Sequence, residues 1–270
     1  MPMRRSSLPV VGALLLAAGL TAVFPAAALA QGTINFTSKP ITGQVADALA
    51  RGPDGSLWFV NQGANTVGHV TFPDLKVTTF NVPTANAGLA SITAGPDGRM
   101  WFTESTAMKI GRIDASGTFA EFPTPGGSPP PQRIFPGPNG TLWATSCTFF
   151  EPQFFGCGNF IVTTTAGTST FLTTEANSFS KSFGAAGCAL GADGNAWCFG
   201  TESVQNPFSS ENKIARFTPT GGYASFAPPT SLFHQGFAIV GAPDGNVWYT
   251  WKSRTDSATG VARFTRAGVI

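Results

Sequence analysis

Hydrophobic and polar positions alternate along five related stretches of the chain, and each stretch joins two apolar runs through a short polar turn. The second stretch reads "LASITAGPDGRMWFTE" over residues 89–104. Alternation of this kind is typical of half-buried β-strands, and Asp-Gly suits a tight turn because both residues tolerate positive φ. The pattern predicts a hairpin with strands at 89–94 and 99–104. The alternation continues in "KIGRID" (109–114) and "TFAEFP" (118–123), which we expect to be a third and a fourth strand.

The same turn and tryptophan recur along the chain. The other copies are "ARGPDGSLWFVN", "FPGPNGTLWATS", "ALGADGNAWCFG" and "VGAPDGNVWYTW". Their tryptophans, with that of the second copy, are Trp58, Trp101, Trp143, Trp197 and Trp248. A strand-rich repeat of forty to fifty residues is the mark of a propeller blade. We therefore predict an all-β fold, a β-propeller of four-stranded blades with five blades visible.

The ends of the chain refine this prediction. The fifth copy stops at "RFTRAGVI", where its fourth strand should begin, and "GTINFTSKP" (32–40) reads like a spare fourth strand. We expect residues 32–40 to complete the fifth blade and to leave no open sheet edge. The alternative is a fragment of a longer propeller. The longer third and fourth copies are expected to place their insertions in the loop after the second strand.

The first thirty residues differ from the rest. Arg4 and Arg5 precede an apolar run, and "ALA" at 28–30 fits a small-residue cleavage site. We interpret residues 1–30 as a signal peptide cut before Gln31, and residues 31–270 as one propeller domain. A membrane anchor is the alternative, which Pro25 and the alanine-rich end disfavour. The protein is then expected to be secreted or periplasmic.

Charge and hydropathy exclude two classes of partner. The chain has 16 Lys and Arg, and two of them lie in residues 1–30. The remaining 14 equal the 14 Asp and Glu in number. A neutral domain lacks the basic face that nucleic-acid binding needs. No later stretch is long and apolar enough to span a bilayer. We expect a monomer whose partner is a small molecule, glycan or peptide.

Four cysteines lie in the exported part, where disulfides are permitted. Cys147 and Cys157 are ten residues apart, as are Cys188 and Cys198, and the second pair brackets a predicted hairpin turn. We predict the disulfides Cys147–Cys157 and Cys188–Cys198. Four cysteines allow three connectivities, which the sequence alone does not distinguish. A zinc site is disfavoured because no CxxC spacing or nearby His accompanies them.

The second copy carries a family resemblance. "GPDGRMWFTE", "KIGRID" and "TFAEFP" resemble the streptogramin B lyase (virginiamycin B lyase) family of β-propellers, over nearly all of the mature chain. The resemblance implies a carbon–oxygen lyase that opens a cyclic depsipeptide by elimination. In that family a His removes the α-proton while Mg²⁺ stabilises the enolate. The His opens the first strand of a blade, fourteen residues before the Glu of WFTE, and seven blades are usual.

A comparison by position shows that most residues of that mechanism are replaced in this chain. Glu104 matches the WFTE glutamate, but Ala90 stands where the resemblance places the His. The same position in the other copies holds Asp47, Gln132, Ala186 and Phe237. The glutamate position elsewhere holds Asn61, Ser146, Gly200 and Trp251. Of the two histidines, His69 is interpreted as structural, and His234 is a weak candidate for a base. Glu104 and Asp47 are weak candidates for metal ligands.

Two functions remain in competition. The first is a secreted, non-catalytic propeller that binds a small molecule, sugar or peptide at its central face, without a cofactor. Its candidate binding residues are Asn61, Glu104, Glu202 and Trp251, with Gln62 and Lys252 beside them. The alternative is a Mg-dependent C–O lyase acting on a cyclic depsipeptide, with His234 as base. A sugar-lactone hydrolase would need a cluster of carboxylates and amides on a divalent metal, and the sequence does not assemble one. A structural or assembly propeller is a third class of function. We expect no linearisation of streptogramin B antibiotics.

Overall fold

The computed structural model describes residues 46–150, 154–176, 181–205, 208–227, 235–242, 244–252 and 259–265. The chain divides into two units, Met1–Ser38 and Lys39–Ile270, and every described residue belongs to the second. The signal peptide, the domain boundary at residue 30 and the closing strand at 32–40 lie outside the described residues. They stay predictions.

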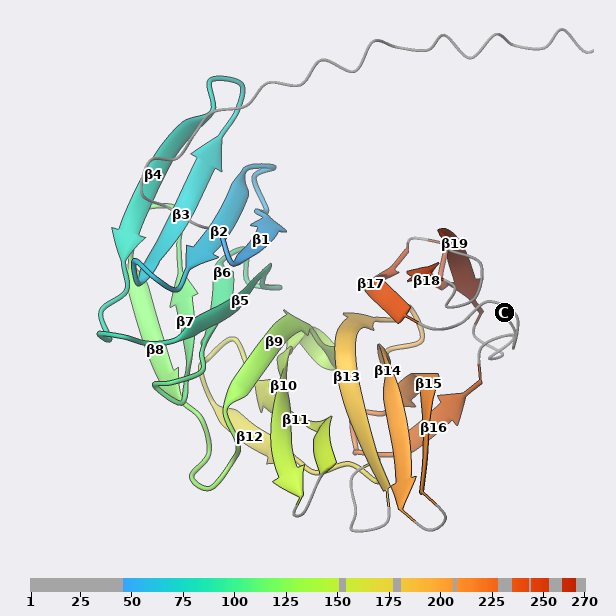
Figure 1. The fold of residues 1–270 in the computed structure, drawn as a ribbon. Coiled ribbons are helices and arrows are strands. Elements are labelled where there is room, and N and C mark those ends of the chain that lie inside the picture. The colour runs from blue at the N-terminus through green and yellow to red at the C-terminus, as the bar shows by residue number, and fades with distance from the viewer. Residues whose placement is uncertain are drawn as a thin grey trace, which may run out of the picture. The chain divides into compact units, whose positions relative to one another are not determined.

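The described residues form 19 strands in five antiparallel sheets, which confirms the all-β prediction (Figure 1). The first sheet contains β1 (Ala48–Arg51), β2 (Leu57–Asn61), β3 (Thr66–Thr71) and β4 (Lys76–Asn81). The second contains β5 (Leu89–Ala94), β6 (Met100–Glu104), β7 (Lys109–Ile113) and β8 (Phe119–Pro123). The third contains β9 (Pro131–Pro136), β10 (Leu142–Phe150), β11 (Phe154–Thr163) and β12 (Ser169–Leu172). The fourth contains β13 (Lys181–Leu190), β14 (Ala196–Gln205), β15 (Phe208–Phe217) and β16 (Tyr223–Phe226). The fifth contains β17 (Gln235–Gly241), β18 (Val247–Lys252) and β19 (Thr259–Phe264).

The sheets are the blades of a β-propeller. Strands are hydrogen-bonded in chain order within each sheet. The first strands of successive sheets contact one another, β1 with β5, β5 with β9, β9 with β13 and β13 with β17. The first strand of each blade is therefore its innermost strand. The only helical segment among the described residues is a 3₁₀ turn at Pro138–Gly140.

Four of the five repeated tryptophans pack between neighbouring blades. Side chains alternate across a strand, so Trp101 and Phe102 point to opposite faces of β6. Phe102 joins the core between the first and second blades, and Trp101 joins the core between the second and third. Trp58, Trp143 and Trp197 likewise join the core toward the following blade. The second, third and fourth blades thus bury both of their faces against neighbouring blades, which explains the repeat.

The turn before each tryptophan is built to receive the indole ring. Trp101 Nε1 donates to Asp97 Oδ1 at 2.9 Å, and Trp197 Nε1 donates to Asp193 Oδ1 at 3.0 Å. A Cβ on Gly95 would lie 2.3 Å from the Trp101 ring, so only glycine fits beneath it. Gly98 closes the turn with φ of +73°, a conformation that favours glycine. The motif GPDG-x-x-W is therefore a structural unit.

The insertions of the third and fourth copies lengthen strands. We expected these residues in a loop after the second strand. Instead, β10 pairs with β11 from Leu142 to Phe150, and β14 pairs with β15 from Ala196 to Gln205. In the third copy the inserted residues include Thr148, Phe149 and Phe150, and β-branched and aromatic residues extend a hairpin ladder. The inserted residues of the fourth copy are mostly polar, and their composition does not explain the longer strands.

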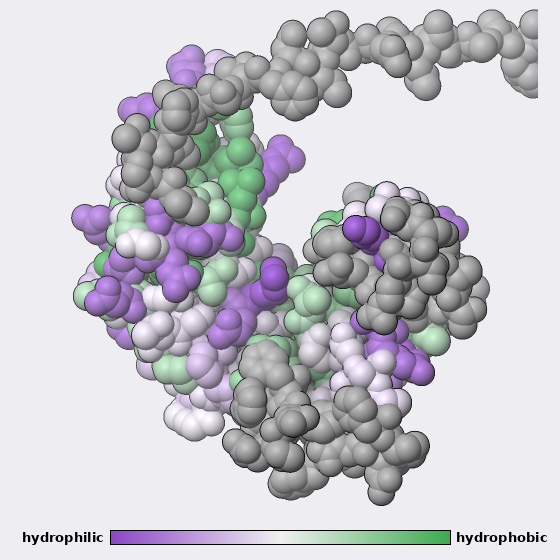
Figure 2. All heavy atoms as spheres, viewed as in Figure 1, coloured by the Kyte–Doolittle hydropathy of each residue, from purple (hydrophilic) through white to green (hydrophobic). Residues whose placement is uncertain are grey.

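Both predicted disulfides are present. The Cα atoms of Cys147 and Cys157 lie 3.9 Å apart, and those of Cys188 and Cys198 lie 4.1 Å apart. Each bond joins neighbouring strands of one blade, and the two bonds suggest an extracellular or periplasmic setting. None of the helices in the described part of the chain could cross a membrane. Figure 2 shows hydrophilic residues mixed with hydrophobic ones on the visible surface, with hydrophobic residues gathered over the first sheet, where Leu49 is 61% exposed.

Candidate functional site

The innermost strands of four blades share a β-bulge. Between β5 and β6 the pairing passes from Leu89–Glu104 to Ile92–Phe102, so two residues of β5 face one of β6. The same kind of register shift occurs in the pairing of β9, β13 and β17 with their neighbours. The residues within these bulges are Ala90 and Ser91, Gln132 and Arg133, Ala186, and Phe237 and Ala238.

These bulges contain the positions that the sequence comparison aligned with the family's catalytic His. A bulge redirects a side chain away from the regular alternation of the strand, and bulges gather beside functional sites. In this propeller the bulge residues of the second and third blades line a cleft of about 330 Å³. The cleft is lined by Asp47, Ala48, Ala90, Ser91, Gln132, Arg133, Thr145, Cys147, Cys157 and Ala185. We take this central cleft as the candidate site.

A second hollow of about 220 Å³ adjoins the central cleft and shares Ser91 and Arg133 with it. It is lined by Ser91, Arg133, Ile134, Phe135, Ala186, Gly187, Cys188, Ala238 and Ile239. The side chains of Ile134 and Phe135 are buried in the cores between blades, so the second hollow presents mainly backbone and small side chains beside Ser91 and Arg133.

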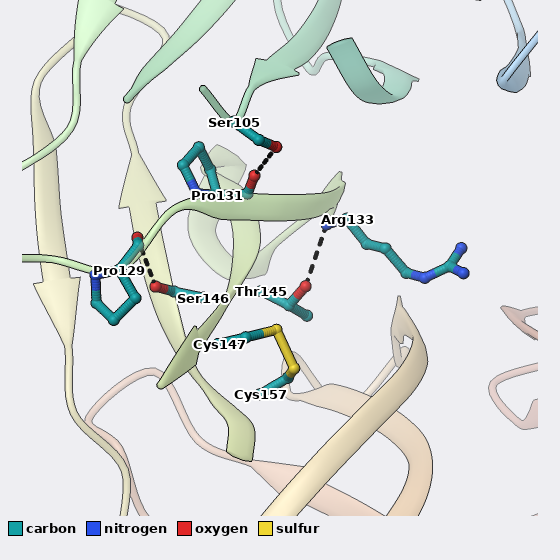
Figure 3. Close-up of a disulfide and its surroundings, with 8 residues drawn as sticks. All are labelled: Ser105, Pro129, Pro131, Arg133, Thr145, Ser146, Cys147 and Cys157. Carbon is teal, nitrogen blue, oxygen red and sulfur yellow. Dashed lines mark hydrogen bonds between the residues drawn. A yellow bond between two sulfur atoms is a disulfide. The ribbon is translucent and has the colours of Figure 1, made fainter. Parts of the chain in front are cut away.

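Arg133 is fixed at its backbone and exposed at its side chain. Its backbone N–H donates to Thr145 Oγ1 at 3.1 Å, and the next N–H, of Ile134, donates to Ser91 Oγ at 3.2 Å. These two hydroxyls satisfy donors that the bulge removes from the ladder. The Arg133 side chain extends away from β9 (Figure 3). No carboxylate of the described residues lies within ion-pair distance of its guanidinium.

Neighbouring elements also hold β9. Ser105, which belongs to the second blade, donates to the Pro131 carbonyl (Figure 3). Ser146 Oγ donates to the Pro129 carbonyl at 2.8 Å (Figure 3). Thr103 Oγ1, also from the second blade, donates to the Gln132 carbonyl at 2.8 Å. The segment that carries Arg133 is therefore tied to its own blade and to the preceding one.

Asp47 brings a negative charge to the same cleft. It directly precedes β1 in the first blade, and its Oδ2 accepts a hydrogen bond from the backbone N–H of Gln62 at 2.7 Å. Its side chain is exposed. The cleft therefore contains a carboxylate from the first blade and a guanidinium from the third, with the small residues of the second blade between them.

Glu104 lies away from the cleft, inside the blade packing. It is 0% exposed, and neither carboxylate oxygen has a hydrogen-bond partner. A Cβ on Gly111 would lie 2.7 Å from its Oε1, so the side chain lies over β7. Burial raises the pKa of Glu104 to about 7, and the charge of Glu121 adds to this while Lys109 opposes it. At neutral pH much of this group is therefore protonated.

A separate ion pair stands beside Glu104. Lys109 Nζ lies 2.9 Å from Glu121 Oε2, and Thr84 donates to the same carboxylate through both its backbone N–H and its hydroxyl. Burial raises the pKa of Glu121, but the hydrogen bonds from Thr84 and Lys109 outweigh burial and hold it below the ordinary value. Lys109 is thus engaged with Glu121, which leaves Glu104 without a direct partner.

The other candidate binding residues serve the packing of their own blades. Glu202 forms an ion pair with Lys181 and accepts a hydrogen bond from Tyr223 Oη at 2.7 Å. Asn61 is buried, and its Oδ1 accepts from the Ala64 N–H at 2.9 Å. Trp251 packs against the core between the fourth and fifth blades. The structure does not bring these side chains together with Asp47, and His234 lies outside the described residues.

The described residues do not fit the Mg²⁺ that the family resemblance implies. Within the described ranges, no three His, Cys, Asp or Glu side chains are grouped so that they could hold a metal ion. Asp47 lines the cleft, but Glu104 is enclosed beneath the blade surface. One carboxylate is too few for a tight Mg²⁺ site.

Among the residues of the cleft that sequence reasoning missed, two lie in the bulges, Ser91 and Arg133. Each directly follows a position compared with the family's His, because Ser91 follows Ala90 and Arg133 follows Gln132. A bulge places two successive residues opposite one, so both can project from the same side of the ladder. The repeated position was visible in the sequence, but the bulge was not. The Cys147–Cys157 bond also lines the cleft.

Comparison with known proteins agrees with the fold and the motifs. The model of the virginiamycin B lyase family matches residues 27–149. A catalytically inactive virginiamycin B lyase from Staphylococcus aureus, solved with quinupristin, has a TM-score of 0.63 and 25% identity over 86% of this chain and 70% of that one. No curated protein matches the chain.

Two more distant structures share the fold alone. A gluconolactonase from Xanthomonas campestris has a TM-score of 0.54 and 14% identity, over 83% of this chain and 74% of its own. The calcium-binding protein regucalcin from Agrobacterium tumefaciens has a TM-score of 0.52 and 14% identity, over 84% and 72%. Sequence and structure together show that the chain is similar to the streptogramin B (virginiamycin B) lyases in fold, and that the virginiamycin B lyase family pattern lies in residues 27–149.

Proposed function

We propose that the protein is a secreted, non-catalytic propeller that binds a small molecule, sugar or peptide in the central cleft. The observation that carries the proposal is that residues of the bulges line the central cleft. The bulges of the second and third blades place Ala90, Gln132 and Arg133 in one cleft, which Asp47 of the first blade also lines, and Ala90 occupies the position of the family's base. The cleft thus keeps groups that bind, and alanine stands where the family has its His base.

The electrostatics of the cleft support binding. Arg133 supplies hydrogen-bond donors in a planar fork, Asp47 supplies acceptors, and the Gln132 side chain can do both. A few polar groups in a mostly preformed cleft are typical of ligand sites. The small side chains of Ala48, Ala90 and Ala185 keep the space between the polar groups open.

Catalysis by elimination lacks two of its parts among the described residues. A general base needs a pKa near the working pH and must lie within hydrogen-bond reach of the α-proton. Glu104 has such a pKa, but it is buried away from the cleft. The acid cluster needed for Mg²⁺ is also lacking in the described part of the chain.

Secretion is part of the same proposal. The basic and apolar start of the chain, with "ALA" at 28–30, supports export. The two disulfides support an oxidising compartment. N-terminal sequencing of the protein from culture medium or periplasm is expected to begin at Gln31, and retention of residues 1–30 on an extracellular protein would contradict the cleavage.

Two assays test the function itself. Purified protein incubated with quinupristin and Mg²⁺ is expected to leave the antibiotic unchanged in mass spectrometry. Linearised product that disappears in His234→Ala would establish the lyase alternative. Linearised product that survives His234→Ala would show another base and would equally overturn the proposal.

Binding is measured by calorimetry with quinupristin, cellobiose and an N-acetylated tripeptide. At least one probe is expected to bind wild type and to lose affinity in Asp47→Asn. Asp74→Asn is the matched control, because Asp74 is exposed in the turn between β3 and β4. Equal loss in both variants would remove the central cleft as the site.

A further inference from the structure

Two opposite charges line the central cleft without neutralising each other. Asp47 comes from the first blade and Arg133 from the bulge of the third. Among the described residues, no ion pair joins either side chain to another group. Both charges are therefore available to a ligand in the cleft.

The backbone holds both charged residues in place before a ligand arrives. The Asp47 N–H donates to the Val60 carbonyl at 2.9 Å, and Asp47 Oδ2 accepts from the Gln62 N–H at 2.7 Å. The Arg133 N–H donates to Thr145 Oγ1 at 3.1 Å. Within the described ranges this leaves Asp47 Oδ1 and the Arg133 guanidinium to form hydrogen bonds with a ligand.

A ligand that covers both residues removes water from a positive and a negative charge. This removal is costly unless a strong interaction replaces the water. An anion would compensate Arg133 but place a like charge near Asp47, and a cation would do the reverse. The hydroxyls of a neutral sugar bind a charged group less strongly than an opposite charge does. The complementary ligand therefore carries one charge of each sign.

The size of the cleft indicates how far apart these two charges lie in the ligand. A cleft of about 330 Å³ is roughly 7 Å across if its dimensions are alike, and two residues of an extended chain span about the same length. In a free amino acid the ammonium and the carboxylate share one carbon atom, so a single residue is too short. Gln132 also lines the cleft, and its amide can bind a peptide group through both its donor and its acceptor.

We propose that the central cleft binds a short peptide with both of its ends unblocked, of about two residues. The ammonium binds Asp47, the carboxylate binds Arg133, and the peptide group binds Gln132. Arginine suits the carboxylate because its planar fork donates two parallel hydrogen bonds. This inference rests on the proposed function and names its ligand.

Calorimetry on the full secreted protein compares three probes. They are alanyl-alanine, N-acetyl-alanyl-alanine and alanyl-alanine amide. Acetylation removes the positive charge and amidation removes the negative charge, so each is expected to weaken binding about 10- to 100-fold. Both preferences are measured on the wild type, and they test the proposal whether or not a variant folds.

Two variants assign each preference to its residue. Asp47→Asn is expected to lose the preference for the free over the acetylated amino end and to keep the preference for the acid over the amide. Arg133→Gln is expected to show the opposite pattern. Asp74→Asn and Arg51→Gln are the matched controls, because both residues are exposed and neither lines the cleft. Both controls are expected to keep both preferences.

The outcomes separate the two proposals. Equal affinity for the three probes, or failure of alanyl-alanine to bind, would overturn this inference and leave the binding function with a different ligand. A preference at one terminus alone would also overturn it, because the ligand would then need one charge. So would a preference that survives the variant assigned to it. Turnover of quinupristin would instead overturn the proposed function itself.

Discussion

The indole nitrogen of Trp101 donates a hydrogen bond to Asp97 Oδ1 at 2.9 Å, which couples the turn of the second blade to the core between the second and third blades. Asp97 also lies 3.4 Å from Arg99 and 3.8 Å from Arg112. One carboxylate thus holds the turn, the buried ring and two surface cations.

Loss of this carboxylate should destabilise the protein. Asp97→Ala leaves the buried Trp101 N–H without its acceptor, which costs about 1–3 kcal/mol. Urea unfolding of the two proteins measures the difference. Asp74→Ala is the control, because Asp74 is exposed, and its expected effect is close to zero. Equal loss in both variants would mean that the indole hydrogen bond contributes little.

Gly111 is predicted to be intolerant of any side chain. A Cβ there would lie 2.2 Å from the Phe102 ring, in the core between the first and second blades. Gly111→Ala must displace that ring, and overpacking of this kind costs about 1–3 kcal/mol or more. Gly126→Ala is the control, because no heavy atom lies within 4 Å of the added Cβ. Thermal unfolding that shows similar melting temperatures for the two variants would contradict the packing described here.

The Cys188–Cys198 bond is predicted to stabilise the fourth blade. It spans ten residues of one hairpin, for which the chain-entropy estimate gives about 2–3 kcal/mol. The double variant Cys188→Ala with Cys198→Ala should therefore unfold at lower urea concentration by that amount. Treatment with reductant should lower the urea midpoint of the wild type in the same way. It should change the urea midpoint of the variant less. A variant as stable as wild type would show that the strand pairing alone holds the hairpin.

Glu104 should make stability depend on pH. Its folded pKa of about 7 lies above the ordinary value of 4.5, so the folded protein binds more protons than the unfolded chain between these values. Stability should then fall as pH rises from 5 to 8, by at most about 3 kcal/mol from this group. Glu104→Gln should remove this decline and be the more stable protein at pH 8.

Urea unfolding at pH 5, 6.5 and 8 measures the decline. Glu175→Gln is the matched control, because Glu175 is exposed, and it should keep the wild-type dependence on pH. A decline that persists unchanged in Glu104→Gln would assign it to a different group.

The strands of the second blade could be predicted almost to the residue, for a physical reason. Alternation, Asp-Gly turns and glycines beneath aromatic rings all act within about ten residues of each other, and so they are visible in one sequence. The positions of the disulfides followed from the same local spacing. The fold was predictable because the residues that determine each blade lie close together in the sequence.

The candidate site was less predictable, because it depends on relations between blades. The motif drew attention to Glu104, yet the glutamate follows Phe102 into the core at a period of two and ends up fully buried. Arg133 carries no motif, and only the bulge in β9 directs it into the cleft. Pairing irregularities of this kind leave little trace in a single sequence.

The shared bulges have an evolutionary consequence. Ala90, Gln132 and Ala186 stand outside the regular ladder, and none of them belongs to the cores between blades. Mutation can therefore exchange these residues at little risk to folding. A lineage could gain or lose a proton acceptor there in one step, while tryptophans and glycines a few residues away remain fixed. The propeller separates what selection must preserve from what it is free to vary.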